Sequence, residues 1–419
     1  HDKSNLFKSG LSNGECPYDY GGYFIINGNE KVIISQDRIA ENKTYVFKHV
    51  KNKNQLVAEI RSVPDNIFSP HKLTTLILST KETQFDKNIK VSLYHIKQEI
   101  PLFILFRAFG IESDKEIVEY IFHDLSDPFN LELANYLKGS IEDANDCLYT
   151  INALEYMSKY LSISGYPKEI LMNKEHRINI VKKILYNDFL PHVGTCYKKK
   201  AFYIGSMAAK LIKCSLGIIP LDDRDCYTNK RIDTPGVLMS NLFRQYYGKV
   251  LNDMKIALNK EFKDGSWKVN NNFIDIINEH NIYKLMKSST IESGFKYSFA
   301  TGNWGLKNQG NKSKQGVAQV LNRLTYTATL SHLRRINTPM EKNGKLPKPR
   351  KLHNTQWNII CPAETPEGAS IGLVKNQSMK CIILVSTDNI DISEIYLEKL
   401  GIIIFINIIS INTYKLIII

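Results

Sequence analysis

The hydrophobic pattern of this 419-residue chain changes its period near Ile100, and this change most constrains the fold. Before it, segments such as LVAEIRSV and NIKVSLYHI, within residues 56–97, alternate apolar and polar residues as β-strands do. After it, segments such as EIVEYIFHDL are helical by spacing, and Ile178, Val181 and Leu185 recur at i, i+3 and i+7. Both patterns in a chain of this length predict a mixed α/β (α+β), multi-domain protein.

The N-terminal part is predicted to form a β-meander. CPYDYGGYFIING places a turn at Asp19–Gly22, a strand at Tyr23–Ile26 and a hairpin signal at Asn27-Gly28, before a strand at Lys31–Ser35. Further along, the polar break LDDRDCYTN at 221–229 indicates a domain boundary. A long helix from about Pro235 to Glu261 and another near Asn272–Lys287 are predicted after it.

Positive charge is concentrated in one stretch. Between Asn303 and Lys351 the chain carries eleven Lys and Arg residues and one acid, Glu341, so the stretch has a formal charge of +10, against +13 for the whole chain. A polyanion fits such a segment, because each phosphate that it neutralises releases condensed counterions. A solvated basic face is the alternative interpretation.

Inside the basic stretch a helix is predicted. Its apolar face follows helical spacing at Val317, Val320, Leu321, Leu324 and Ala328. The other face offers Gln319, Asn322, Arg323 and Tyr326, and the exit delivers His332, Arg334 and Arg335 before Thr338-Pro339 ends the helix. Polar loops are predicted on both sides, at Gln309–Lys314 and at Met340–Pro347, the latter with Asn343-Gly344 at its tip.

Cysteine spacing and the two ends of the chain give weaker signals. Seven cysteines without a C-x-x-C pair predict reduced thiols in an intracellular compartment and no zinc site. The chain starts at His1, without Met or a signal peptide, so a fragment or a processed piece is expected. The tail Gly401–Ile419 holds ten isoleucines. Its polar residues count against a membrane span, while a buried β-hairpin and translated non-coding sequence both stay open.

Several long motifs resemble, in order, the second-largest subunit of multisubunit RNA polymerase. ECPYDYGGYFIINGNEKVIISQDRIAEN is similar to that subunit's protrusion, and KQEIPLFILFRAFGIESDKEI and KAFYIGSMAAKLI resemble its lobe. GVAQVLNRLTYTATLSHLRRINTP, GKLPKPRKLHNTQW and CPAETPEGASIGLVKN look like its fork. The resemblance runs from about residue 11 to about 390. It is closer to the eukaryotic RNA polymerase II type and its large-DNA-virus relatives than to the bacterial subunit.

The resemblance implies an order of domains. Residues 1–57 would be the first part of the protrusion, 58–221 the lobe, 222–285 the return segment of the protrusion and 286–392 the fork. Residues 393–419 would be a divergent isoleucine-rich tail, either the start of the external region or non-native sequence.

The resemblance also implies an activity, DNA-templated RNA synthesis from nucleoside triphosphates by a nucleotidyltransferase complex. The expected partners are the largest subunit and other polymerase subunits, the template and non-template DNA strands and nascent RNA, with no membrane. The expected location is the nucleus, or the cytoplasm or virion for a viral protein. Mg²⁺ would be held mainly by the largest subunit, and the family's Zn²⁺ site lies outside this sequence, so this chain alone is not expected to be active. An inactive gene fragment and a stand-alone nucleic-acid-binding remnant are the alternatives.

Roles for individual residues follow from the resemblance. The two loops correspond to the first and second fork loops, where Lys312, Lys314, Lys342 and Lys345 would contact phosphates. Gln319 and Asn322 would lie beside nascent RNA, where amides meet ribose hydroxyls, or would be ordinary polar helix residues. Arg334 and Arg335 are expected to bind nucleic acid, with Arg335 in the wall that faces the RNA–DNA hybrid.

No residue of this chain is expected to be catalytic. Arg350 would support the active centre from behind the nucleotide-addition site, with Glu367 near it, and this pair would either transmit nucleotide occupancy to the fork or only hold the fork together. His332, beside two arginines, is expected to stay neutral and hydrogen-bonded. Trp304 and Trp357 are expected to be core anchors rather than base-stacking platforms.

Overall fold

The computed structural model describes residues 16, 18–48, 55–64, 69–79, 87–162, 173–264, 282–283, 285–287, 289–306, 314–340, 344, 346–383 and 416–418. The chain forms two compact units. The first, called the inserted unit here, comprises Ala40–Arg224 and Thr387–Thr413, of which only the former holds described residues. The second, called the discontinuous unit, combines His1–Ile39, Asp225–Ser386 and Tyr414–Ile419. Both contain helices and sheet strands, which confirms the mixed α+β class.

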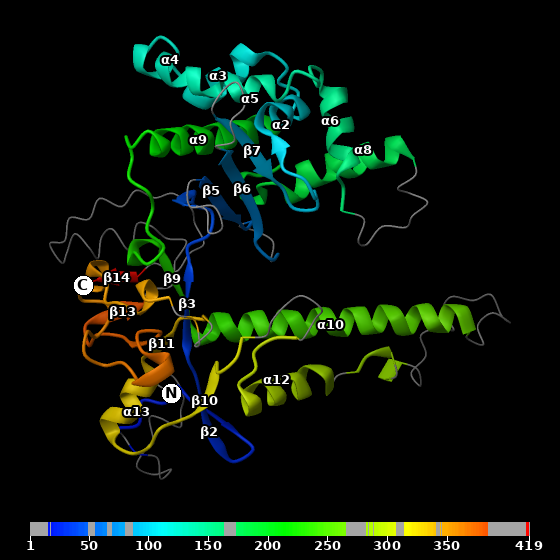
Figure 1. Ribbon diagram of the computed structural model, residues 1–419. Helices are drawn as coiled ribbons and strands as arrows, with labels where there is room; N and C mark the ends of the chain where they lie inside the picture. Colours follow the sequence, from blue (N-terminus) through cyan, green and yellow to red (C-terminus); the bar gives the residue numbers. More distant parts are fainter. Residues whose placement is uncertain are drawn as a thin grey trace, which may run out of the picture. The chain divides into compact units, whose positions relative to one another are not determined.

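A five-stranded antiparallel sheet lies at the centre of the inserted unit. Its strands follow the order of the chain: β4 (Tyr45–Lys48), β5 (Leu56–Ser62), β6 (Lys72–Ser79), β7 (Asn88–Ser92) and β8 (Ile100–Pro101). Alternate residues of β6 are buried, as the alternating sequence predicts. Figure 1 shows the central strands side by side, with helices packed against them.

Helices follow the sheet in sequence and enclose its hydrophobic side. They are α2 (Leu102–Ala108), α3 (Asp114–Phe122), α4 (Pro128–Ala134), α5 (Lys138–Glu142), α6 (Thr150–Lys159), α8 (Lys174–Lys183) and α9 (Tyr197–Ser215). Every residue of α2 is buried, and α9 packs against β4, β5 and β6. One continuous hydrophobic core therefore joins the sheet to the helices.

Two basic side chains are buried inside the inserted unit. The Arg107 guanidinium donates hydrogen bonds to the carbonyl oxygens of Ala144 (2.6 Å) and Cys147 (3.0 Å). Lys200 on α9 donates from Nζ to the carbonyl oxygen of Leu185 (2.7 Å), in the π-helical turn η2 (Ile184–Asp188). Burial lowers the pKa of Lys200 to about 8. Both cations satisfy main-chain carbonyls, so they serve the fold of this unit.

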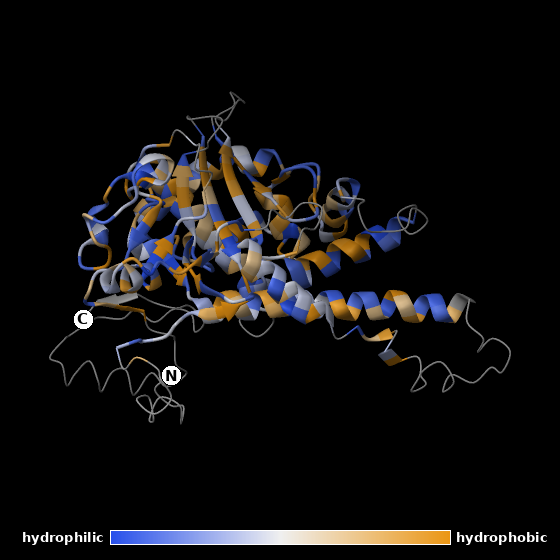
Figure 2. Ribbon diagram, turned by 90° about the horizontal axis from the view of Figure 1, so that it is seen from below, coloured by the Kyte–Doolittle hydropathy of each residue, from blue (hydrophilic) through white to orange (hydrophobic). Residues whose placement is uncertain are grey.

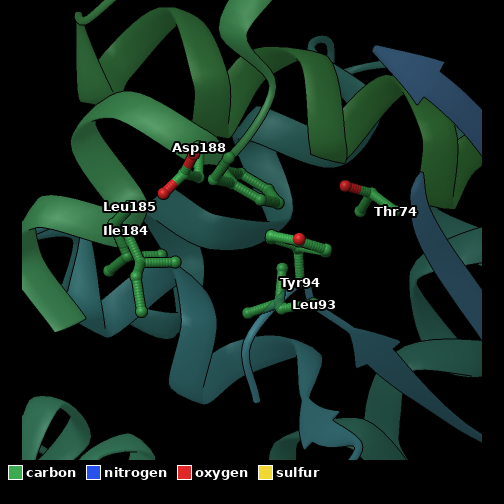
Figure 3. A pocket seen from close by; sticks show the side chains of 7 residues that line it. Thr74, Leu93, Tyr94, Ile184, Leu185 and Asp188 are labelled. Atoms are coloured by element: carbon green, nitrogen blue, oxygen red, sulfur yellow. The ribbon is translucent and has the colours of Figure 1, made fainter. Parts of the chain in front are cut away.

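A narrow crevice lies where η2 approaches the sheet (Figure 3). Its lining residues come from β6, from the segment after β7 and from η2 and the residue that follows it: Thr74, Leu93, Tyr94, Ile184, Leu185, Asp188 and Phe189. The crevice has no room for a water molecule. It is therefore a packing gap and not a ligand cavity.

The discontinuous unit begins with the predicted β-hairpin. β1 (Phe24–Ile26) pairs antiparallel with β2 (Asn29–Ile33), and Asn27 and Gly28 form the turn with φ of 50° and 77°. Positive φ at both central residues is what a two-residue hairpin of this twist requires, and Asn-Gly supplies it at low cost. β10 (Ala318–Val320) pairs with the other edge of β2, although nearly three hundred residues separate them in sequence.

A second sheet joins three parts of the sequence. Its order is β12 (Val374–Asn376), β11 (Arg335–Asn337), β3 (Ser35–Ile39) and β9 (Lys230–Asp233). β11 runs parallel to β3, and the other two pairings are antiparallel. Of the isoleucine-rich tail only β14 (Leu416–Ile418) is described, paired with β13 (Cys381–Ile383).

Two helices complete the discontinuous unit. α10 (Pro235–Asp264) confirms the predicted long helix, and α12 (Ser289–Thr301) lies alongside it (Figure 1). Figure 2 shows hydrophobic and hydrophilic residues alternating along α10. Trp304 is buried, and its indole N–H donates to the carbonyl oxygen of Leu238 (2.9 Å), so its prediction as a core anchor is confirmed. The helix predicted near Asn272–Lys287 lies largely outside the described residues. No helix in the described part of the chain is long and apolar enough to cross a membrane.

The helix predicted from Val317 to Ala328 is wrong in its first half. Residues 318–320 form β10, and the helix α13 spans only Tyr326–Leu333. The backbone N–H of Ala328 donates to the Thr325 hydroxyl (3.1 Å), so Thr325 caps the start of the helix. Residues 318–320 pair with β2 instead, and Val320 and Leu324 are exposed rather than part of a buried helix face.

Candidate nucleic-acid interface

Gln319, Asn322 and His332 form one hydrogen-bonded group between β10 and α13. The backbone N–H of Asn322 donates to His332 Nδ1 (3.1 Å), and His332 Nε2 lies 3.1 Å from Gln319 Oε1. Because Nδ1 accepts, the proton belongs on Nε2, which donates to the Gln319 amide oxygen. The Gln319 amide nitrogen donates to the Gly316 carbonyl oxygen (3.0 Å). The Gln319 side-chain amide is thus held by a histidine that also accepts from the main chain of Asn322.

His332 is almost fully buried, and its electrostatics agree with this arrangement. Burial, and secondly the positive charge of Arg335, lower the pKa of His332 to about 4. Protonation would also turn Nδ1 into a donor facing the Asn322 N–H. The expectation that His332 stays neutral and hydrogen-bonded is therefore confirmed.

Arg323 is paired within the protein. Its guanidinium donates to both carboxylate oxygens of Glu30 (2.8 and 2.9 Å) and reaches Asp19 Oδ2 (3.3 Å). It also lies over the ring of Tyr23, 4.9 Å from its centroid. The hydrogen bonds from Arg323 hold the pKa of Glu30 below its usual range. One of the eleven basic residues of the stretch is thus neutralised by acids from the β1–β2 region. Sequence reasoning did not find this pairing.

Arg334 and Arg335, at the end of α13, have different surroundings. The Arg334 guanidinium donates to the carbonyl oxygens of Ser378 (2.7 Å) and Cys381 (3.0 Å), so Arg334 holds the chain after β12. Arg335 begins β11 with its side chain half-buried, no hydrogen bond of its guanidinium is found among the described residues, and the Nε atoms of both arginines are buried without a partner. Arg335 is thus the less committed of the two toward the protein.

A buried polar cluster is formed by side chains of the sheet of β12, β11, β3 and β9 and of the residue that follows β11. The Thr338 hydroxyl donates to Asp37 Oδ2 (2.8 Å), and Lys375 Nζ lies 3.7 Å from the same oxygen. Burial lowers the pKa of Lys375, which Asp37 opposes by favouring the charged form. Thr338 comes just before the Met340–Pro347 loop, so this cluster fixes the base of that loop. Sequence reasoning missed Asp37 and Lys375, since neither belongs to a pattern until the sheet forms.

Arg350 joins the far end of the same loop to the turn after Glu367. Its guanidinium donates to the carbonyl oxygens of Ala369 (2.8 Å), Ile371 (3.0 Å) and Gly344 (3.3 Å). Glu367 is exposed and immediately precedes the 3₁₀ turn η9 (Gly368–Ser370). The structure therefore brings Arg350 to the turn that follows Glu367 through hydrogen bonds to main-chain carbonyls, and the pairing of Arg350 with Glu367 stays a prediction.

Lys314 is exposed at the end of the predicted first loop. Its main-chain groups pair with those of Trp304, and its ammonium lies 3.6 Å from Asp233 Oδ2. Glu364, which precedes Glu367 by three residues, accepts a hydrogen bond from the Ser331 hydroxyl. Lys312, Lys342 and Lys345 lie outside the described residues.

Trp357 contradicts its prediction as a core anchor, because 79% of its surface is exposed. The neighbouring Ile359 and Ile360 are buried instead, in a cluster with Ile336. The main chain turns at Asn358, with φ of 61°.

All seven cysteines are free thiols. Among the described residues, no group of three or more His, Cys, Asp or Glu side chains is placed to hold a metal ion.

Two family models match this chain. RNA polymerase Rpb2, domain 2, matches residues 40–233, and RNA polymerase Rpb2, domain 3, matches residues 319–383. The first match contains the described part of the inserted unit, and the second contains most of β10 together with α13, Arg350 and the Glu367 turn. Alignments with relatives cover about nine-tenths of this chain, and this span includes both matched regions.

Three relatives show the breadth of the similarity. DNA-directed RNA polymerase II subunit 2 of Arabidopsis thaliana is 43% identical over 396 residues, which is 93% of this chain and 31% of that protein. DNA-directed RNA polymerase subunit 2 of Acanthamoeba polyphaga mimivirus is 35% identical, over 92% of this chain and 32% of the viral protein. DNA-directed RNA polymerase subunit Rpo2N of Methanococcus vannielii is 35% identical, over 93% of this chain and 71% of the archaeal protein.

This chain therefore spans about a third of the length of the RNA polymerase II relatives and more than two thirds of the archaeal one. The chain belongs to the family of second-largest subunits of DNA-directed RNA polymerase.

Proposed function

We propose that this chain takes part in DNA-templated RNA synthesis from nucleoside triphosphates, as a portion of the second-largest subunit of a multisubunit polymerase. The observation that carries the proposal is the 43% identity to an RNA polymerase II subunit over 93% of this chain. In this role the partners are the largest subunit, both DNA strands and nascent RNA. The proposed location is the nucleus, or the cytoplasm or virion for a viral protein.

The contribution proposed for this chain is the fork, which keeps the strands apart and supports the active centre. The arrangement around Met340–Pro347 supports it: Thr338 is bonded to Asp37 at one end of the loop, and Arg350 is bonded to the Glu367 turn at the other. The described residues at both ends of this loop are thus anchored. The lysines that the sequence places in the loop, Lys342 and Lys345, would meet phosphates without regard to sequence, as transcription requires.

Gln319, Asn322 and Arg335 are the proposed contacts to RNA and to the RNA–DNA hybrid. The neutral His332 supports this role, because it orients the Gln319 amide without adding a charge of its own. Arg334 also belongs to the proposed nucleic-acid-binding set, although its guanidinium donates to two main-chain carbonyls. Catalytic Mg²⁺ is proposed to be held mainly by the largest subunit, and no step of phosphoryl transfer is assigned to this chain.

Arg350 gives the direct test. In a polymerase reconstituted with this sequence, Arg350→Ala should slow nucleotide addition about tenfold and leave assembly intact, since it removes charge-assisted hydrogen bonds of about 1.5–3 kcal/mol from the loop anchor. Elongation is measured on a primed RNA–DNA scaffold, and assembly by gel filtration.

Two further variants sharpen that test. Arg350→Lys keeps the charge but loses the planar fork, so it should behave like Arg350→Ala if the paired carbonyl contacts matter. Lys296→Ala, an exposed cation on α12 outside the basic stretch, should elongate normally. Unchanged elongation by both Arg350 variants would remove Arg350 from the active-centre support.

A further inference from the structure

An open hollow lies beside the contact between α3 and α9 of the inserted unit. α3 packs against α9 (Figure 1), and the hollow has a volume of about 360 Å³, within the range of small-molecule sites. Its lining comes from α3, from the residue that follows α3 and from α9: Glu116, Glu119, Tyr120, His123 and Phe202. We call it the acidic hollow. None of these residues belongs to the proposed nucleic-acid interface.

Helical spacing gathers the lining of the acidic hollow. Its first four residues stand at i, i+3, i+4 and i+7, which is one face of a helix. α9 approaches α3 closely at Gly205, where a Cβ would come within 2.2 Å of the Tyr120 carbonyl oxygen. Phe202 lies three residues before Gly205, on the same side of α9. The tight contact of the two helices therefore fixes Phe202 beside the acidic face of α3.

His123 is held in the acidic hollow by a strained turn. Its φ of 63° and ψ of −53° and the hydrogen bond from the Asp124 N–H to the Phe122 carbonyl oxygen (2.7 Å) define the rare γ-turn with positive φ. Backbone strain of this kind is concentrated at ligand sites and switches. The imidazole of His123 is stacked on the Phe202 ring, with centroids 4.3 Å apart and an interplanar angle of 14°. The strained turn thus builds an aromatic wall of two rings.

The aromatic wall stays open to a ligand. His123 covers one face of the Phe202 ring, yet 52% of the Phe202 surface is exposed, so much of the ring remains accessible. The half-buried Tyr120 adds a further ring to the lining. The π-electrons of such rings attract cations, most strongly those whose charge is spread over alkyl groups.

Two carboxylates give the acidic hollow its negative charge. Glu119 forms one ion pair among the described residues, with the highly exposed Lys115 at 4.0 Å, and exposed pairs of this kind contribute little. Glu116 is exposed, and no ion pair or hydrogen bond of its side chain is found in the described part of the chain. A cation in the hollow would therefore meet two carboxylates that the protein leaves largely unpaired.

The lining favours an organic cation over a metal ion. Ca²⁺ and Zn²⁺ sites draw on several oxygen, nitrogen or sulfur ligands. Within the described ranges, no group of three or more His, Cys, Asp or Glu side chains is placed to hold a metal. Aromatic rings offer a metal no lone pair, whereas they are the usual surroundings of substituted ammonium groups.

A neighbouring hollow of equal volume has the opposite charge. It shares His123 with the acidic hollow, and two lysines, Lys210 and Lys213, line it. A cation would be repelled there, so it is expected in the acidic hollow alone. Lys213 therefore offers a matched control position on the same helix, α9.

We infer that the acidic hollow binds an organic cation, an ammonium group that carries alkyl substituents. The alkyl groups would lie against the rings while the charge faces Glu116 and Glu119. Free small molecules and methylated lysines of polypeptides both present this chemistry. Because the acidic hollow is separate from the proposed nucleic-acid interface, loss of one role would leave the other intact.

Choline and 3,3-dimethylbutan-1-ol are the matched probes, because they share a shape and only choline is charged. Ligand-observed NMR titrations of this chain give a dissociation constant for each. Choline should bind in the millimolar range, as expected of so small a ligand. The uncharged alcohol should bind about tenfold more weakly, because it loses the attraction to the rings and carboxylates.

Two conservative variants test the lining. Phe202→Leu keeps an apolar side chain and loses the ring, and Glu119→Gln keeps the shape and loses the charge. Each should weaken choline binding about fivefold. Lys213→Ala, in the neighbouring hollow, should bind choline like the wild type. Phe202 and Glu119 are exposed and Lys213 is partly exposed, so all three variants should fold, which circular dichroism melts verify.

Equal binding of choline and the alcohol, or no binding of either, would overturn the inference. Choline binding that neither Phe202→Leu nor Glu119→Gln weakens would overturn it too, as would an equal loss in Lys213→Ala. A further titration with N-acetyl-trimethyllysine amide separates the two sources of the cation. Tighter binding of this compound than of choline would support the inference and assign the cation to a polypeptide. The reverse order would support it and assign the cation to a free small molecule.

Discussion

In the inserted unit, one hydrophobic core runs from the five-stranded sheet to α9, and its two buried cations, Arg107 and Lys200, donate to main-chain carbonyls of the same unit. In the discontinuous unit the described buried apolar residues divide into three smaller clusters. Its distant segments are joined by polar contacts such as Arg323 with Glu30.

The two units therefore differ in what stabilises them. The apolar residues of the inserted unit form one core, and the unit has a size at which domains commonly fold by themselves. The discontinuous unit holds residues far apart in sequence together through hydrogen bonds and short strand pairings.

A core truncation in the inserted unit is the largest test of this contrast. Phe103 on α2 is fully buried, so Phe103→Ala should lower the free energy of unfolding by about 3–5 kcal/mol through lost burial and the cavity left behind. Urea unfolding followed by circular dichroism should show two transitions, with only that of the inserted unit displaced. Equal displacement of both transitions would mean that the units do not unfold independently.

Acid should act on the discontinuous unit through His332. Its folded pKa of about 4 lies below the unfolded value near 6.5, so between these values the unfolded chain binds more protons. The stability supplied by the neutral form is complete above about pH 6.5 and is lost as the pH falls toward 4. The upper limit is about 3 kcal/mol for a shift of this size.

His332→Gln is the matched variant for that experiment. Glutamine accepts a hydrogen bond but does not titrate, so the pH dependence of the second transition should become flatter between pH 4 and 6.5. His192 of the inserted unit, whose pKa burial also lowers to about 4, should continue to affect the first transition. A second transition equally steep in wild type and His332→Gln would rule out His332 as the titrating group.

The smallest expected effect concerns the Arg323–Glu30 pair. Arg323→Gln removes a two-pronged ion pair between partly exposed side chains, so it should lower the stability of the discontinuous unit by about 1 kcal/mol or less. The effect should shrink in 1 M salt, because exposed charges are screened there. A loss of several kcal/mol would show that the β1–β2 hairpin depends on this pair for its attachment.

Local patterns in the sequence were enough to predict many elements. The Asn27-Gly28 hairpin, the alternating strands of the inserted unit, the helices that follow Ile100 and the long helix α10 all appear in the structure. Each depends on turn chemistry or on a period set by neighbours in sequence. Burial, which lowers the pKa of His332 most, came from the tertiary structure, whereas the smaller contribution of Arg335, three residues away, was predictable from the sequence.

Contacts between distant segments had to come from the tertiary structure. Val317 and Leu321 fit a helical period, yet pairing of β10 with β2 places this stretch in a sheet and leaves Val320 exposed. The acids that neutralise Arg323 lie about three hundred residues away, and nothing local marks them. Trp357 is a large aromatic residue of a kind usually found in cores, yet it lies at the surface.

The sequence by itself determined the family, the fold class and a stretch of charge +10. Only the tertiary structure decided which of those charges stay available, because pairing is a matter of distance and not of order along the chain. It binds Arg323 to Glu30 and Arg334 to main-chain carbonyls, and it leaves Arg335 less engaged. It also turns Trp357 outward, although its composition suits a core.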